Sequence, residues 1–302
     1  LQLSEASLAF KDSMVEAADV GGALTVFDLD RCEAEFTSAG LTMGRAGVSI
    51  TVRSRESDIR IMDSFVENGA GSAQSTAVRQ EGGTLEVRGS TIGKKDGEPG
   101  NIARLATGVE ADNARINIEG SLLNAGGGNG VVQMNIRSSS VTVSDSRLEN
   151  GPADEFSYLV RVNGGSCTLS NVEMLSRESY DLYGIKAEGR AAVLMRSSSL
   201  ELAPAQNTCT GIMLDAQTIG TVQSSRLTAS GGRGAAAVRQ EGSGFQQSNG
   251  TPSPNLKLIE NTFSGWEYLL INAREQVRTI EALESEKPPF DLKNPNRGNR
   301  QE

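Results

Sequence analysis

The chain has 302 residues, with 29 basic and 38 acidic side chains and a formal net charge of −9. An acidic surface repels phosphate groups, which argues against nucleic acid and anionic lipid as partners. The 34 glycines and an aromatic content of only 4% favour many short strands separated by turns over a helical core.

The start of the chain and its cysteines limit its class further. Leu1-Gln2-Leu3 lies inside a repeat and follows no basic segment, so we expect a mature product or a fragment of a longer protein. No apolar run reaches the roughly 18–20 residues of a membrane-spanning helix, so we expect no direct membrane insertion. Three cysteines imply no disulfide framework, and Cys167 is interpreted as a small buried hydrophobe.

A degenerate repeat runs through the chain at intervals of mostly 25 to 27 residues. Its clearest unit is apolar-x-apolar-x-x-Ser-x-apolar, as in VTVSDSRL at 141–148. We call the serine position the marker. The markers are Ser13, Ala39, Ser64, Ser90, Ser121, Ser146, Val172, Ser198, Ser225 and Asn261. A small residue here suits a tight bend in which its hydroxyl bonds the backbone, so the markers predict structure and not catalysis.

The positions that flank the markers are more uniform in residue type than the markers themselves. Three residues before them stand Phe10, Phe36, Ile61, Val87, Ile118, Val143, Leu169, Met195, Val222 and Leu258. Two residues after them stand Val15, Leu41, Val66, Ile92, Leu123, Leu148, Met174, Leu200, Leu227 and Phe263. All twenty are apolar in a chain that is 37% hydrophobic, so we expect them to point inward.

Each repeat carries a further strand with alternating apolar residues, as in 48–52 and 158–162. The pentapeptide AVRQE occurs twice, at 77–81 and 237–241, in the same place of its repeat. Its Arg79/Glu81 and Arg239/Glu241 pairs are predicted to face outward from a strand and to serve solubility or edge chemistry. Paired glycines such as Gly82-Gly83 and Gly164-Gly165 follow these strands and indicate repeated turns.

Short strands that cannot bury their inward side chains alone must stack. The pattern therefore predicts an all-β fold, a single-stranded right-handed parallel β-helix (solenoid) of about ten coils. The spacing and irregular loops resemble the right-handed, pectate-lyase-like β-helix superfamily over about Leu3 to Ala273, nearly the whole chain. The resemblance is to the fold, and no catalytic motif of that superfamily is present.

Two regions are predicted, the β-helix at 1–273 and a C-terminal region at 274–302. Within the second, Arg274 to Lys287 has helical spacing and predicts a short capping helix, which Pro288-Pro289 ends. Trp266 and Phe290 are expected to pack nearby. The polar tail from Asp291 to Glu302 is expected to be loose or docked as a strap.

Length variation concentrates after the apolar residue that follows the marker. The longest insert is Gly93 to Ala106, and others are Asn124 to Gly130, Gly151 to Ser157, Ser176 to Asp181 and Ala203 to Thr208. Stacked inserts on one edge are where solenoids bind. A binding site at 93–106 would use Lys94, Lys95, Asp96 and Arg104, with the three cations facing a polyanionic sugar. The alternative is a solvated loop of mixed charge.

The pectate-lyase-like resemblance implies enzymes that often cleave acidic polysaccharides, with carboxylates that hold calcium or act in pairs. Asp28, Asp30, Glu33 and Glu35 are the nearest acidic cluster, which could hold a cation or be a solvated turn. The chain has no histidine, the easiest acid–base group and the commonest transition-metal ligand. We expect no cofactor, no metal and no catalytic residue.

Two functions remain. The favoured one is a non-catalytic structural, scaffold or adhesion module, whose partner would be carbohydrate or another surface protein. The alternative is a polysaccharide lyase or glycoside hydrolase that acts on an acidic glycan, which rests on the fold resemblance alone. The same resemblance and the Ser/Thr/Asn-rich character imply an extracytoplasmic location, in the periplasm, on the cell surface or secreted.

Overall fold

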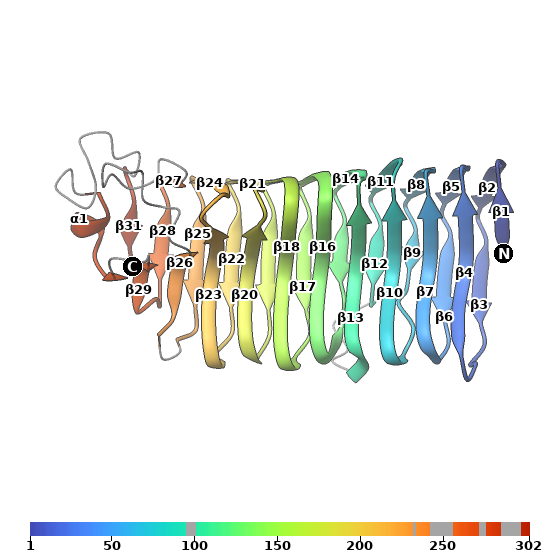
Figure 1. Ribbon diagram of the computed structural model, residues 1–302, viewed down its shortest axis with the longest axis horizontal. Coiled ribbons are helices and arrows are strands. Elements are labelled where there is room, and N and C mark those ends of the chain that lie inside the picture. Colours follow the sequence, from blue (N-terminus) through green and yellow to red (C-terminus); the bar gives the residue numbers. More distant parts are fainter. Residues whose placement is uncertain (95–100, 232–233, 242–255, 272–275, 285–296) are drawn as a thin grey trace.

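The chain forms an elongated parallel β-solenoid, as the computed structural model in Figure 1 shows. Strands make up 72% of the residues and helix 2%. The structure describes residues 1–94, 101–231, 234–241, 256–271, 276–284 and 297–302. The predicted all-β parallel β-helix is confirmed, with about nine turns where the repeat indicated about ten coils.

Each turn contributes three strands, and equivalent strands stack into three faces of the rod. The first face holds the longest strands: β1 (Gln2–Ser4), β4 (Ala23–Asp30), β7 (Ala46–Arg55), β10 (Gly71–Glu81), β13 (Asn101–Asp112), the first parts of β16 (Gly127–Ser144) and β18 (Ala153–Ser170), β20 (Ser179–Glu188), β23 (Ala205–Asp215), β26 (Ala236–Glu241) and β29 (Tyr268–Ile271).

The second face continues around a tight corner, which β16 and β18 cross without a break. It holds β2 (Ser7–Lys11), β5 (Glu33–Thr37), β8 (Asp58–Met62), β11 (Thr84–Arg88), β14 (Arg115–Glu119), the second parts of β16 and β18, β21 (Ala192–Arg196), β24 (Ile219–Gln223) and β27 (Leu256–Ile259).

The third face is a separate sheet of 11 strands. Its strands are β3 (Met14–Ala17), β6 (Gly40–Met43), β9 (Phe65–Val66), β12 (Thr91–Gly93), β15 (Leu122–Asn124), β17 (Arg147–Asn150), β19 (Glu173–Ser176), β22 (Ser199–Leu202), β25 (Arg226–Ala229), β28 (Thr262–Ser264) and β31 (Arg300–Gln301). Neighbouring strands on this face are parallel and keep the repeat in register, as in Leu123↔Leu148 and Leu148↔Met174.

The predicted flanking positions form the core. Eighteen of the twenty are at most 1% exposed, and the other two, Phe10 and Val15, lie in the first turn and pack against the core while partly exposed. Successive turns place like residues over one another, so that Ile61, Val87 and Ile118 form part of one continuous column. Burying such columns is the main source of stability for turns that cannot fold alone.

The markers line the inside of the corner between the second and third faces, which we call the marker corner. The residue before each marker has a positive φ, for example Asp63 (48°) and Gly120 (56°), and this turns the chain. The Ser90 hydroxyl donates to the Arg88 carbonyl (2.7 Å) and accepts from the Ser64 backbone N–H (3.0 Å). The predicted structural role of the marker is confirmed.

The second of these bonds joins coil to coil and forms what we call the marker ladder. Its further rungs run from the Ser90, Ser121, Val172, Ser198 and Ser225 N–H groups to the side-chain oxygens of Ser121, Ser146, Ser198, Ser225 and Asn261, at 3.0 to 3.2 Å. Each rung satisfies a backbone donor that would otherwise be buried without a partner.

The C-terminal end differs from the prediction in one respect. The predicted short C-terminal helix is confirmed as α1 (Ile280–Leu283), whose Thr279 side chain accepts from the Ala282 N–H (3.3 Å). Before it, β30 (Gln276–Val277) pairs antiparallel with β29, because the open edge of the last first-face strand offers unpaired backbone groups. Phe290 lies outside the described residues. Within those described, no helix is long and apolar enough to span a membrane.

The end of the tail is docked as a strap. β31 pairs with β28 as the last strand of the third face, and Figure 1 shows it at the end of the rod opposite the N-terminus. Asn299 precedes β31 and extends the marker ladder, since its Oδ1 accepts from the Asn261 N–H (3.0 Å) and its Nδ2 donates to the Leu258 carbonyl (2.9 Å). Trp266 is buried, with its indole N–H bonded to the Leu227 carbonyl (2.8 Å).

Candidate functional site

The predicted binding insert at 93–106 is described in part. Lys94 Nζ lies 2.9 Å from Glu67 Oε1 of the preceding coil, so its charge is matched within the protein. Arg104 is exposed on β13, whereas Lys95 and Asp96 lie outside the described residues. Contacts of these side chains with a polyanionic sugar therefore stay a prediction.

The acidic stretch at 28–35 is divided by a corner of the rod, with its first two carboxylates on β4 and its last two on β5. Asp28 lies 3.5 Å from Arg55, and Glu35 lies 2.9 Å from Lys11. The hydrogen bond from Lys11 lowers the pKa of Glu35. Among the described residues, no group of three or more His, Cys, Asp or Glu side chains could hold a metal ion.

Charged side chains of the first face form rows that run along the rod. Arg79 Nε lies 2.9 Å from Glu81 and 3.6 Å from Glu110 of the next coil, whose other oxygen lies 3.7 Å from Arg137. Register places Arg239 in the same row as Arg79. The predicted outward position of both Arg/Glu pairs is confirmed, and we call these rows the charge ladder.

The inserts stack on one edge, where the third face leads into the first, and we call it the insert edge. Strand pairing there is irregular in successive coils, at Gly71/Gln74, Asn101/Ala103, Gly128/Gly130, Ala153/Phe156 and Ser179/Asp181. These positions all lie at the start of a first-face strand. The predicted gathering of length variation on one edge is confirmed.

Just past the insert edge, β18 and β20 depart from simple alternation. Two successive residues are buried, as with Leu159 and Val160, so the side chains on both sides of the pair reach the surface. Tyr158 and Arg161 consequently face each other, with the guanidinium carbon 5.9 Å from the ring centre. A local irregularity of this kind re-aims side chains, as β-bulges do.

Aromatic side chains gather on this part of the surface, and we call Phe156, Tyr158, Tyr180 and Tyr183 the aromatic edge. The rings of Tyr158 and Tyr183 are stacked, with centres 4.9 Å apart and an interplanar angle of 13°. Phe156 lies 5.4 Å from Tyr158 and covers Gly130 of the preceding coil, where a Cβ would overlap its ring. Tyr180 is 47% exposed.

The surroundings of the stacked tyrosines are polar and charged. Partial burial raises the pKa of Tyr158 and of Tyr183, and the Asp181 carboxylate raises both further. Lys186 Nζ lies 5.9 Å from the Tyr158 ring centre and 2.9 Å from Glu188. Both phenols therefore stay protonated at neutral pH and can donate as well as accept a hydrogen bond.

The sequence contained a signal for this cluster that composition alone obscured. Tyr158 and Tyr183 are 183 − 158 = 25 residues apart, which is one repeat interval. Equal positions in adjacent coils must stack, so two tyrosines one repeat apart predict a ring pair. The chain has only four tyrosines and one tryptophan, so composition alone gives no sign of an aromatic cluster.

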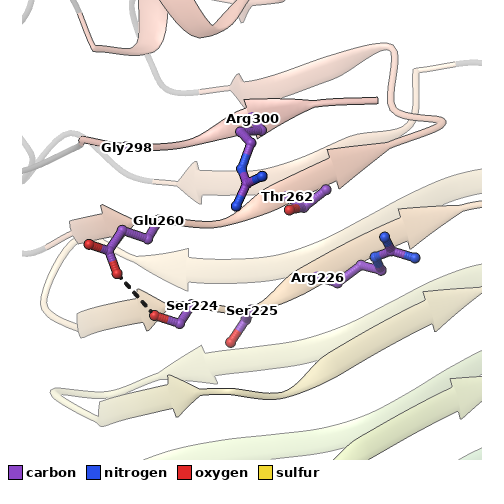
Figure 2. A pocket seen from close by; sticks show the side chains of 7 residues that line it. All are labelled: Ser224, Ser225, Arg226, Glu260, Thr262, Gly298 and Arg300. Atoms are coloured by element: carbon purple, nitrogen blue, oxygen red, sulfur yellow. Dashed lines mark hydrogen bonds between the residues drawn. The ribbon is translucent and has the colours of Figure 1, made fainter.

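A hollow lies outside the marker corner (Figure 2). One part of about 510 Å³ is lined by Ser224, Arg226, Glu260 and Arg300 among others, and an adjoining part of about 780 Å³ shares Ser224 and Arg226. Ser224 donates to Glu260 (3.2 Å), as the dashed line in Figure 2 shows, and Arg226 lies 3.2 Å from Glu302. These polar groups are used within the protein, so the aromatic edge is the stronger candidate.

The three cysteines are free and buried. Burial raises the pKa of Cys167 to about 12 and that of Cys209 to about 11. Cys167 pairs with Val141 and Val193 in adjacent coils, which confirms its predicted role as a small buried hydrophobe.

We expect the folded protein to be inert toward a disulfide-exchange reagent at pH 8, because all three thiols are buried and the raised pKa values of Cys167 and Cys209 leave little thiolate. Urea should expose all three thiols to rapid reaction. Colour release measured with and without urea checks this. Fast reaction of one thiol in the native protein would contradict the buried positions.

Comparison with known proteins gives no matching family model, no matching curated protein and no matching solved structure.

Proposed function

We propose that this chain is a non-catalytic β-helix module that acts outside the cytoplasm as a structural and binding rod. The observation that carries the proposal is the charge ladder of the first face. Glu110 joins neighbouring coils, since its carboxylate lies 3.6 Å from Arg79 and 3.7 Å from Arg137, and Glu81 lies 2.9 Å from Arg79 within one coil. A polysaccharide-cleaving site would need carboxylates and cations of this kind as its acids and bases. In the charge ladder these groups are paired with one another, which supports a structural role.

We propose that the chain is related to the pectate-lyase-like β-helices in its fold and lacks their catalytic activity. It is supported by the three stacked parallel faces and by irregular inserts that lie mostly on one edge. A polar, Ser-rich surface on an elongated rod suits the periplasm, the cell surface or the medium. The partner is carbohydrate or another surface protein, held at the insert edge.

We expect the full chain to leave polysaccharides intact. Polygalacturonate, alginate and hyaluronate would be incubated with the protein, with and without added calcium, and also with neutral glucans. Solution viscosity, reducing ends and ultraviolet absorbance of unsaturated ends should stay at the level of a buffer blank. An active lyase run in parallel confirms that each assay responds.

The result that would overturn the proposal is viscosity loss or new unsaturated ends on any of these glycans, provided that it follows the protein through purification. Glu110→Gln then separates the two interpretations. In a structural ladder this change alters stability only, whereas a catalytic carboxylate would lose turnover without loss of folding.

A further inference from the structure

The aromatic edge is a rigid surface that exists before any ligand arrives. Tyr158 and Tyr183 hold each other by stacking, and Phe156 is seated over Gly130. Side chains already fixed in place lose little conformational entropy when they bind. The edge spans two successive coils, with Phe156 and Tyr158 on β18 and the other two rings on β20, so its rings follow one another along the rod.

Hydrogen-bonding groups surround these rings. Asn207 Nδ2 donates to Asp181 Oδ1 (2.8 Å), and Thr208 lies opposite Asp181 in the next coil. Asn207 is exposed and keeps further donor and acceptor capacity toward solvent. Alternating donors and acceptors beside aromatic rings match a ligand that carries many hydroxyl groups on an otherwise apolar ring.

The charge around the aromatic edge distinguishes neutral from anionic ligands of this kind. Asp154, Glu155 and Glu178 are exposed there and Asp181 is half-buried, whereas Arg177 is the exposed cation beside them. The nearest first-face cations, Arg161 and Lys186, both approach Glu188, at 4.0 and 2.9 Å. An acidic edge on a chain of net charge −9 repels a polyanion.

We propose that the aromatic edge binds a neutral, hydroxyl-rich polysaccharide that lies along the rod across Phe156, Tyr158, Tyr180 and Tyr183. This inference rests on the proposed binding function and specifies its ligand. It departs from the polyanionic sugar that the basic residues of the 93–106 insert suggested. Aromatic rings supply the contact area, and the phenols, Asn207 and Asp181 bond the sugar hydroxyls.

The test is affinity electrophoresis of the full chain in gels that contain mixed-linkage β-glucan, galactomannan, hydroxyethyl cellulose or polygalacturonate. We expect retardation in at least one neutral gel and none with polygalacturonate. Tyr158→Ala with Tyr183→Ala should weaken the neutral interaction by about tenfold or more. Tyr158→Phe with Tyr183→Phe keeps the stacked rings and should weaken it less, which keeps the test valid should the alanine variant fold poorly.

Tyr268→Ala is the matched control, because Tyr268 occupies the same row of the first face but lies away from the edge and contacts Arg278. It should bind as the unchanged protein does. Retardation by polygalacturonate alone, retardation by no gel, or equal binding by the double alanine variant would each overturn the inference. None of these outcomes shows glycan cleavage, so the non-catalytic proposal is tested separately.

Discussion

Gly165→Ala should destabilise the protein by roughly 2–5 kcal/mol, the sum of left-handed strain and overpacking. Gly165 has a φ of 78° at the corner between the first and second faces. A Cβ there would overlap the Ser139 carbonyl oxygen and stand 2.6 Å from the Ser139 nitrogen. Both obstacles are backbone atoms of the adjacent coil, which cannot turn aside as a side chain can. Urea unfolding followed by circular dichroism measures the effect.

Gly120→Asn is the control that separates strain from overlap. Gly120 also has a positive φ, 56°, but a Cβ there would meet nothing within 4 Å. Asp145 and Asn171 hold the equivalent place in the following coils at 49° and 55°. The free energy of unfolding should change by no more than about 0.5 kcal/mol. Equal losses in the two variants would show that φ alone, and not the packing of coils, decides which glycines are required.

The repeat was predictable because every coil repeats the same burial problem. The position three residues before the marker is always apolar, and its column is buried from Phe36 to Leu258. An apolar residue at this position in all ten repeats is a stronger signal than the identity of any one residue. The marker corner followed from the same alignment, since compact side chains, mostly serine, fill the inside of a turn whose previous residue has a positive φ.

The aromatic edge was not predictable to the same degree, because the irregular row of the first face has no apolar signature. Its members include Thr51, Ala77, Gln133 and Leu159, all buried, and the glycines Gly108, Gly184 and Gly211. In a strictly alternating strand, Tyr158 and Arg161 would point to opposite faces of the sheet. Only the burial of two successive residues reveals that both side chains lie outside and meet.

The last rung of the marker ladder was missed for a different reason. Asn299 is 38 residues beyond Asn261 and lacks the apolar flanks that identify the other markers. Its place is set by the return of the tail onto the third face, a long-range event that no local spacing encodes. Part of the range predicted as helix is likewise a strand, because Val277 pairs with Leu270.

Asn261→Ala should therefore have a large effect on the C-terminal end of the rod. The Asn261 side chain is fully buried and bonds the Ser225 N–H (3.0 Å), the Val222 carbonyl (2.9 Å) and Asn299 Oδ1 (3.1 Å). Its removal leaves a buried donor and a buried acceptor unpaired, at roughly 1–3 kcal/mol each. Because each coil contacts only its neighbours, the loss should appear first as faster amide exchange in β27, β28 and β31.

Asn261→Ser is the matched variant, since serine fills the marker position in most other coils. Its hydroxyl can accept from the Ser225 N–H as Ser225 accepts from Ser198 (3.2 Å), but it cannot bond Asn299 and Val222 together. We expect a smaller loss of stability and intermediate exchange in β31. If the alanine variant protected β28 and β31 as well as the serine variant does, the ladder would be a consequence of coil stacking and not a contributor to it. Unchanged exchange in β7 and β8, far from the substitution, completes the test, because coupling through nearest neighbours alone predicts that the N-terminal coils keep their protection.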